Sequence, residues 1–235
     1  MDLTVDDALQ ALTARAIPGK GDEMAAYHKA SRPYLGVANP VLDEMAKGWR
    51  RSLEVEQRVR LADELWQSNI HEARVVAAKL LTQARLRPDD SAWSLFQSWV
   101  PDFDAWAIAD HACMAGQRRL LADPARLNQV VSWTQSDHMW TRRAALGITL
   151  PWTKQNHPTV EDLAIRDRVL DWAAGYVPDQ EWFIQKAIAW WLRELSKHDP
   201  QRVVDFLSRH GAEMKAFARR EAARRLPDDL KPVAG

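Results

Sequence analysis

Residues 181–197, with the sequence EWFIQKAIAWWLRELSK, show the pattern that decides the fold. Apolar side chains recur here with the three- and four-residue spacing of one face of an α-helix, at Ile184, Ile188, Trp191, Leu192 and Leu195. Residues 73–84 carry the same pattern, with apolar side chains at Ala73, Val76, Ala77, Leu80, Leu81 and Ala84. Both segments are therefore predicted to be helices that bury one face.

Similar segments follow one another along the whole chain. Further helices are expected at about 4–16, 21–30, 40–50, 54–67, 90–99, 103–116, 124–134, 140–150, 160–175, 200–209 and 212–225. Prolines stand between these segments, as expected for a residue that is excluded from helix interiors, at Pro40, Pro88, Pro101, Pro124, Pro151, Pro178, Pro200 and Pro227. No convincing run of alternating polar and apolar residues predicts a strand.

About a dozen helices of roughly 10–17 residues, joined by short turns, indicate an all-α protein. Helix pairs that repeat every 35–50 residues or so are typical of HEAT-type arrays. We expect residues 1–235 to form a single HEAT-like repeat domain, a curved solenoid whose concave face could bind duplex DNA. A compact helical bundle is the alternative.

The charge balance neither requires nor excludes a nucleic-acid ligand. The 32 Lys and Arg residues equal the 32 Asp and Glu residues, whereas nucleic-acid binders usually carry a basic excess. From residue 181 onward, however, 11 basic residues face 8 acidic ones, a local excess of three. A basic face is therefore possible on a neutral molecule.

Cys113 is the single cysteine, which excludes an intramolecular disulfide and a Cys-rich zinc site. A reducing cytoplasm is the expected compartment. No apolar run reaches the roughly 18 residues that span a bilayer, and the acidic N-terminus lacks a signal pattern. We expect a monomer that does not enter membranes.

Trp106 and Asp110 form the first candidate pair for chemistry. They are four residues apart, so on a helix they share one face about a turn from each other. The ring attracts cations, and the carboxylate can stabilise an oxocarbenium-like centre or orient water. The alternative is a half-buried tryptophan beside a surface or capping aspartate.

Two further segments favour phosphate binding. Arg142 and Arg143 stand at a predicted helix start, where free N–H groups and the helix dipole also attract anions. On the face of residues 181–197 opposite the apolar stripe, Lys186, Trp190, Arg193 and Lys197 are spaced i, i+4, i+7 and i+11. Phosphate contacts by the cations, with Trp190 against a sugar or base, are a natural use. Solvated arginines and a surface helix are the alternatives.

The sequence contains no motif that indicates another kind of catalytic chemistry. The seven histidines show no HExxH or other metal spacing, and GxSxG, P-loop and GxGxxG motifs do not occur. No metal and no cofactor are therefore expected.

Taken together, these segments resemble the AlkD family of DNA glycosylases. The matching residues are Tyr34-Leu35-Gly36-Val37-Ala38-Asn39-Pro40, Trp106-x3-Asp110, Trp140-x2-Arg143-Ala144-Ala145, and Phe183-Ile184-Gln185-Lys186-Ala187-Ile188-x-Trp190-x2-Arg193-Glu194. They run in the family's order and span about Tyr27 to Pro200. The last motif is the most specific and the first is the weakest.

The resemblance implies excision of positively charged N3- and N7-alkylpurines from duplex DNA in base excision repair. It implies a monofunctional enzyme that does not flip the base into a pocket, unlike most glycosylases. By this match Asp110 stabilises the developing positive charge and positions water, Trp106 and Trp190 flank the sugar, and Arg143 holds phosphate. Tyr27 joins the expected DNA contacts.

One position departs from the family. Ala38 aligns with a position that is typically glutamine, and the loss of site residues accompanies loss of excision in some relatives. Two other functions therefore stay open. The chain could be a catalytically inactive HEAT-like DNA-binding relative, or a helical-repeat scaffold for proteins.

Overall fold

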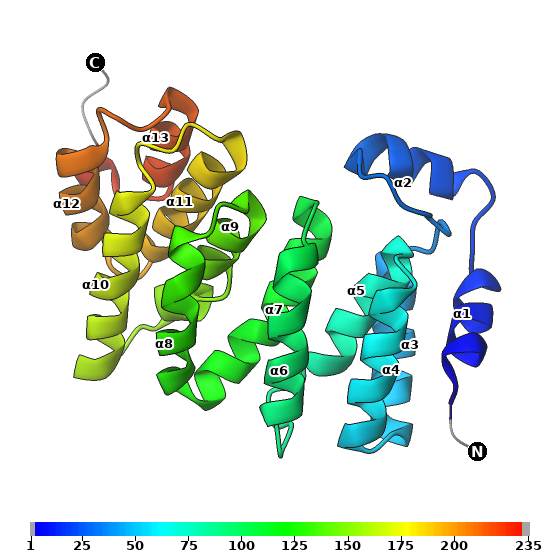
Figure 1. Cartoon of the computed structure of the whole chain (residues 1–235). Coiled ribbons are helices and arrows are strands. Elements are labelled where there is room, and N and C mark those ends of the chain that lie inside the picture. Colours follow the sequence, from blue (N-terminus) through cyan, green and yellow to red (C-terminus); the bar gives the residue numbers. More distant parts are fainter. Residues whose placement is uncertain (1–2, 232–235) are drawn as a thin grey trace. The chain divides into compact units, whose positions relative to one another are not determined.

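The computed structural model describes residues 3–231, and within this range it contains helices and no strands. The all-α fold predicted from the sequence is confirmed (Figure 1). The α-helices of the described range are α1 (Val5–Thr13), α2 (Lys20–His28), α3 (Asn39–Ser52), α4 (Val55–Gln67), α5 (His71–Leu81), α6 (Asp90–Trp99), α7 (Trp106–Ala122), α8 (Leu127–Val130), α9 (Met139–Gly147), α10 (Val160–Gly175), α11 (Trp182–Leu195), α12 (Pro200–His210) and α13 (Ala216–Ala223).

The chain divides into two compact units, Met1–Pro124 and Ala125–Gly235. Helices α1 to α7 belong to the first unit and α8 to α13 to the second. The single repeat domain expected over residues 1–235 stays a prediction, as does its curvature. None of the helices within residues 3–231 has both the length and the hydropathy of a membrane-spanning segment.

Helix α5 is the centre of the first unit. It packs against α3, α4 and α7, and all its residues except Lys79 are buried. A helix that is buried on every side is stable only when neighbours surround it, and the sequence supplies them on both sides of residues 71–81. The apolar stripe expected to continue to Ala84 stops with the helix at Leu81.

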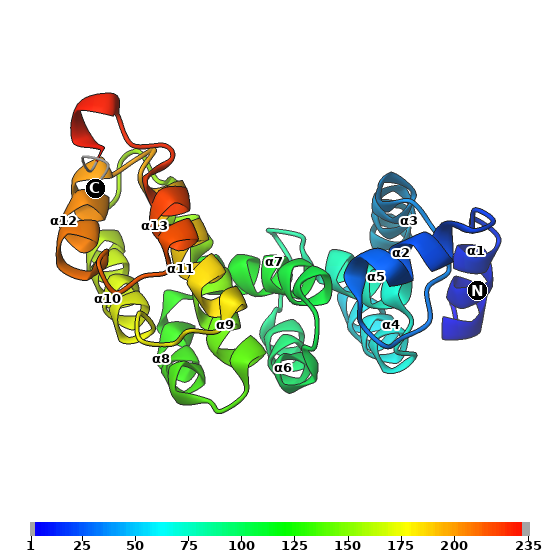
Figure 2. The ribbon, with the colours of Figure 1, turned by 90° about the horizontal axis from the view of Figure 1, so that it is seen from above.

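Helix α11 has the same central place in the second unit, where it packs against α9, α12 and α13. The five apolar residues predicted from residues 181–197 are completely buried: Ile184, Ile188, Trp191, Leu192 and Leu195. Figure 2 shows α11 between α9 and α13. Periodicity alone therefore identified the core side of this helix.

One predicted helix is wrong in form. Residues 124–134 do not make a continuous helix, because the four-residue α8 stands between 3₁₀ turns at Pro124–Arg126 and Val131–Gln135. The helix expected at 103–116 begins instead at Trp106, after a 3₁₀ turn at Val100–Asp102, and extends to Ala122. Proline at positions 101 and 124 brackets this longer helix, since proline ends helices on either side.

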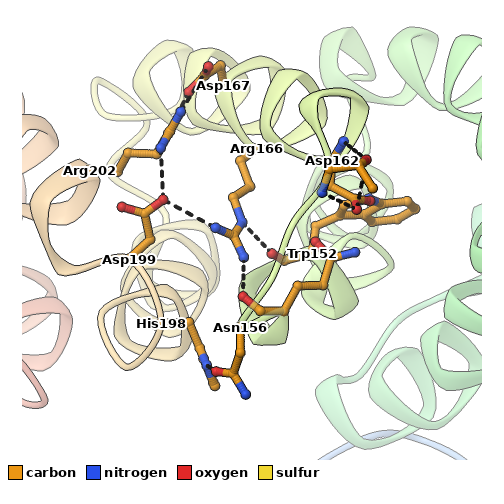
Figure 3. Close-up of polar contacts among 10 residues, drawn as sticks. Trp152, Asn156, Asp162, Arg166, Asp167, His198, Asp199 and Arg202 are labelled. Atoms are coloured by element: carbon orange, nitrogen blue, oxygen red, sulfur yellow. Dashed lines mark hydrogen bonds and ion pairs between the residues drawn. The ribbon is translucent and has the colours of Figure 1, made fainter.

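Buried arginines join the helices within each unit. In α10, Arg166 donates from Nε to the carbonyl oxygen of Trp152 (2.7 Å) and from Nη2 to that of Gln155 (2.7 Å) (Figure 3). Its Nη1 lies 3.2 Å from Asp199, which also accepts from Arg202 at 2.8 Å. Carbonyl groups that the short turns leave unpaired are thereby satisfied.

Arg119 in α7 does the same in the first unit. It is completely buried, donates to the carbonyl oxygens of Gln83 and Leu86, and forms an ion pair with Asp89 at 3.2 Å. In each unit a buried guanidinium thus ties a long helix to an earlier connection, which is the α5–α6 connection for Arg119 and the turn before α10 for Arg166.

Candidate functional site

Trp106 and Asp110 lie in the first two turns of α7, in the first unit. The helix begins at Trp106, since Ala105 before it has an extended backbone (φ −150°, ψ 147°). Ala107, Ile108 and Ala109 are buried, whereas Trp106 and Asp110 are half-buried. The four-residue spacing therefore sets a ring and a carboxylate beside each other on one partly exposed face of the helix, as expected from the sequence.

Four other rings surround Trp106 or stack behind it, and we call the five residues the aromatic cluster: Tyr27, His28, Tyr34, His71 and Trp106. The ring centroid of Trp106 lies 5.9 Å from that of Tyr27 and 5.3 Å from that of His28. His71 stacks on both His28 (4.5 Å) and Tyr34 (4.8 Å). The Trp106 ring is thus held against α2, while Tyr27 stays 70% exposed and accessible to a ligand.

The histidines near this pair are neutral at physiological pH. Burial, reinforced by neighbouring cationic groups, lowers the pKa of His71 to about 3. Burial likewise lowers the pKa of His111 to about 4, although Asp110 opposes this effect, and it lowers the pKa of His28. These three histidines therefore carry no positive charge at pH 7.

Glu72 holds the loop that leads from the aromatic cluster to α3. Its side chain is buried and accepts hydrogen bonds from the backbone N–H groups of Leu35 (2.9 Å), Gly36 (2.7 Å) and Val37 (3.2 Å). A buried carboxylate is tolerable because three donors replace its water. The loop is consequently fixed against the N-terminus of α5.

Glycine is required where this loop meets α2. Gly36 has a φ of 82°, and a Cβ there would lie 2.7 Å from the nitrogen of Gly21. A Cβ on Gly21 would lie 2.6 Å from the carbonyl oxygen of Tyr34. Because these two glycines have no side chains, the backbone of α2 can contact the backbone of the loop. This contact holds Tyr27 of α2 in the aromatic cluster.

Ala38, the position that departs from the family pattern, is the N-cap residue of α3 and is half-buried. Its methyl group provides no side-chain hydrogen bond to the helix N-terminus. A glutamine at this position would add both a donor and an acceptor directly after the loop that Glu72 holds.

In the second unit, the structure brings together two residues that the sequence analysis singled out separately. Arg143 in α9 is 4% exposed, and its guanidinium carbon lies 5.5 Å from the Trp140 ring centroid and 5.9 Å from that of Trp190 in α11. Tryptophan faces attract a guanidinium and restrict its motion. The geometry therefore preorganises Arg143 between two rings.

The predicted cationic face of α11 is present and extends one turn further back. Lys186, Trp190 and Arg193 are half-buried and Lys197 is exposed. Trp182, which precedes Lys186 by four residues, belongs to the same face and is 49% exposed. The Lys186 ammonium lies 5.7 Å from its ring centroid.

Carboxylates that the sequence pattern did not reveal partly neutralise this face. Arg193 forms ion pairs with Glu194 (3.1 Å) and with Glu221 of α13, and Lys197 pairs with Glu194 at 2.6 Å. Although burial acts in the opposite direction, hydrogen bonds from Lys197 and Arg193 hold the pKa of Glu194 below its usual value. Phosphate binding by Arg193 and Lys197 stays a prediction, and these carboxylates would compete with it.

Arg142 has local partners. It donates to the carbonyl oxygens of Ser136 (2.7 Å) and Asp137 (3.0 Å), and it forms an ion pair with Asp179 at 2.8 Å. These bonds fasten the turn before α9 to the turn before α11. Its predicted phosphate contact would have to coexist with this structural role.

Sequence reasoning missed Glu72, Trp182 and the rings of His28 and His71. Glu72 had one possible signal, because it is the only acidic residue of segment 70–81. Trp182 would have followed from extending the i, i+4 line of Lys186 backward. Among residues 3–231, no group of three or more His, Cys, Asp or Glu side chains could hold a metal ion.

Comparison with known proteins identifies a family to which the chain is similar. A family model described as "DNA alkylation repair enzyme" matches residues 8–226. The chain belongs to this family. The resemblance that the sequence motifs indicated is therefore confirmed at the level of the DNA alkylation repair family. A search of curated proteins gave no match.

Solved structures agree with this family assignment. A predicted DNA alkylation repair enzyme from Enterococcus faecalis has a TM-score of 0.77 and 22% identity, with 91% of this chain and 98% of that chain covered. AlkD2 from Streptococcus mutans has a TM-score of 0.62 and 18% identity, with coverage of 95% and 99%. The protein smu.31 from Streptococcus mutans UA159 has a TM-score of 0.61 and 20% identity, with coverage of 80% and 92%. At these identities the likeness establishes the fold.

Proposed function

We propose that this member of the DNA alkylation repair family is a monofunctional DNA glycosylase that removes N3- and N7-alkylated purines from duplex DNA. The observation that carries the proposal is the Trp106–Asp110 pair. It presents a ring and a carboxylate on a partly exposed helix face, with neutral histidines behind it. An enzyme that stabilises a cationic sugar needs this combination of negative charge and π-electron density.

The reaction follows from the substrate's charge. An alkylated purine is cationic, so the bond between C1′ and the base nitrogen can break without a proton donor, and its electron pair neutralises the base. The sugar becomes oxocarbenium-like, water adds to C1′, and the proton released from that water leaves to solvent. Asp110 would stabilise the sugar cation and orient the water, with Trp106 beside the sugar. Trp190, in the second unit, stays a predicted catalytic residue.

DNA binding in this proposal relies on the second unit and on Tyr27. Arg143, held between Trp140 and Trp190, is suited to a phosphate oxygen because its donors keep a fixed direction. Lys186, Arg193, Lys197 and Arg142 would add phosphate contacts, and exposed Tyr27 would contact the strand near the lesion. We expect the enzyme to act as a cytoplasmic monomer without a cofactor.

The decisive experiment incubates the protein with DNA methylated by dimethyl sulfate and measures free 7-methylguanine and 3-methyladenine by chromatography. Release above the spontaneous rate, and its loss in Asp110→Asn, would support the proposal. Spontaneous-rate release by the wild-type protein, with DNA binding intact, would replace it with the second candidate.

That second candidate is a catalytically inactive DNA-binding relative, and Ala38 is the observation in its favour. If the wild-type protein binds DNA and releases no base, Ala38→Gln is the variant to test. Recovered excision would identify the missing side chain as the cause. A protein-interaction scaffold, the third candidate, predicts that binding to DNA is absent even at low salt.

A further inference from the structure

We infer that α13 and the first turn of α11 form a second phosphate-binding surface that contacts duplex DNA away from the lesion, and this inference rests on the proposed DNA-binding function. The surface consists of Trp182, Lys186, Phe217, Arg220 and Arg224. It lies entirely within the second unit. None of its α13 residues was expected from the sequence to bind DNA.

Helix α13 and the two residues after it carry more positive charge than the packing of the helix requires. Residues 216–225 read AFARREAARR and hold four arginines and one glutamate. Ala218 and Ala222 are the buried positions, whereas Arg219, Arg220, Arg224 and Arg225 are exposed. Four like charges within three turns repel one another, so the arrangement favours a polyanionic partner.

The glutamate of this segment offsets only part of the excess. Glu221 accepts from Arg193 of α11 and lies 3.3 Å from Arg224. It thus bridges two guanidinium groups and is neutralised by them. Arg219 and Arg220, by contrast, form no ion pair with any residue of the described range 3–231.

Helical geometry divides these arginines between two faces. Arg220 and Arg224 follow Phe217 by three and seven residues, so they share one face of the helix with Phe217 and remain exposed there. Phe217 on that face stacks on Trp182, with ring centroids 5.6 Å apart and an interplanar angle of 22°. Arg219 follows Phe217 by two residues and therefore points elsewhere.

The surface is held rigidly. Buried Gln185 accepts from the backbone N–H of Lys215 at 2.9 Å and donates to the carbonyl oxygens of Val177 (3.0 Å) and Asp179 (2.9 Å). This contact fixes the start of α13, the Arg193–Glu221 ion pair fixes its middle, and Trp182 positions Lys186. Because Trp182 positions Lys186, this cation would lose little side-chain entropy when it meets a phosphate backbone.

Duplex DNA is the occupant that these features favour over an acidic protein. The cations on the surface are mainly arginines, which bind phosphate oxygens in a bidentate geometry, and they come from two neighbouring helical segments instead of one pocket. The same cationic face of α11 that is proposed to bind DNA continues into this surface through Lys186. The phosphate backbone of one duplex could therefore contact both the cationic face of α11 and this surface.

The test compares Arg220→Gln with Arg219→Gln, a matched control that removes the same charge from the adjacent position on the other face. Binding to an undamaged duplex is measured by fluorescence anisotropy from low to moderate salt. Arg220→Gln is expected to reduce the slope of log K against log salt by about 0.9, the value of one phosphate contact. Arg219→Gln is expected to leave the slope unchanged, and thermal melting checks that both variants are folded.

Equal slopes for the two variants would overturn the inference, and so would a loss of binding to phosphatidylserine-containing vesicles in Arg220→Gln without any effect on DNA. Neither result would count against the proposed base excision. Conversely, the wild-type protein could release no alkylated base while Arg220→Gln still reduces the slope. That result would support the phosphate-binding surface and contradict the glycosylase proposal.

Discussion

The guanidinium carbon of Arg143 in α9 lies 5.9 Å from the centroid of the Trp190 ring in α11, so the ring restricts the position of the guanidinium. The Trp140 ring lies 5.5 Å from the same carbon. Because the rings restrict the guanidinium, a phosphate contact by Arg143, as proposed, would need little reorientation of its side chain.

Replacing Arg143 by lysine should therefore weaken DNA binding although the charge is kept. An ammonium provides no planar pair of donors and is more strongly hydrated, so we expect a roughly tenfold increase in Kd, about 1.4 kcal/mol. Fluorescence anisotropy with a methylated duplex measures it. Arg209→Lys, an exposed position on α12, is the control. Wild-type affinity in Arg143→Lys would show that only the charge matters.

Asp110→Asn keeps the shape of the side chain and removes its charge. We expect base excision to fall by about 10²–10³, the usual loss when a preorganised electrostatic contact is removed. Binding to methylated DNA should persist, since the proposed phosphate contacts come from other residues. Single-turnover release of 7-methylguanine measures the effect, and a rate equal to that of the wild type would remove Asp110 from the mechanism.

Glu72→Gln should destabilise the first unit, because one amide cannot replace a carboxylate that accepts three backbone N–H groups. Hydrogen bonds to a charged group contribute about 1.5–3 kcal/mol, and we expect the free energy of unfolding to fall by an amount in this range. Urea denaturation provides the measurement, with exposed Glu44→Gln as the control. Equal stability of the two variants would contradict the proposed role of the carboxylate.

Acid should destabilise the protein through its buried histidines. Burial depresses the pKa of His71 to about 3, well below the value of 6.5 in an unfolded chain, so between these pH values the unfolded state binds the extra proton. The stabilising contribution is present above pH 6.5 and is lost as the pH falls toward 3. His111, with a pKa of about 4, adds to the same trend.

We therefore expect the urea midpoint to decrease between pH 7 and pH 4, and to decrease less in His71→Phe, which keeps a ring in the stack without a titratable group. His157→Phe removes an exposed histidine and should retain the wild-type pH dependence. Identical pH profiles for His71→Phe and the wild type would rule out His71 as a source of this acid sensitivity.

The parts of the molecule that the sequence predicted are those governed by local spacing. The core side of α11 and the shared face of Trp106 and Asp110 both follow from the periodicity of a helix. The exception is residues 124–134, where apolar spacing indicated one helix and the chain forms α8 between two 3₁₀ turns. The apolar pattern is nearly the same for these two forms, so it could not distinguish them.

What the sequence could not predict depends on pairs far apart along the chain. Arg193 and its partner Glu221 are separated by 28 residues, and Glu72 binds a loop that lies 35 to 37 residues before it. His28 and His71 stack across 43 residues (71 − 28). No periodicity reports such contacts, because they arise when helices pack against one another.

Helix α2 carries Tyr27 but buries none of its residues, and glycine backbones and ring contacts hold it in place. Helices with so little buried surface open locally at a free energy well below that of global unfolding. The amide hydrogens of residues 20–28 should accordingly exchange with deuterated solvent earlier than those of α5 and α11. Slower exchange of this helix alone on addition of a methylated duplex is the result expected if α2 and its Tyr27 contact DNA as proposed, and it requires no measurement of catalysis.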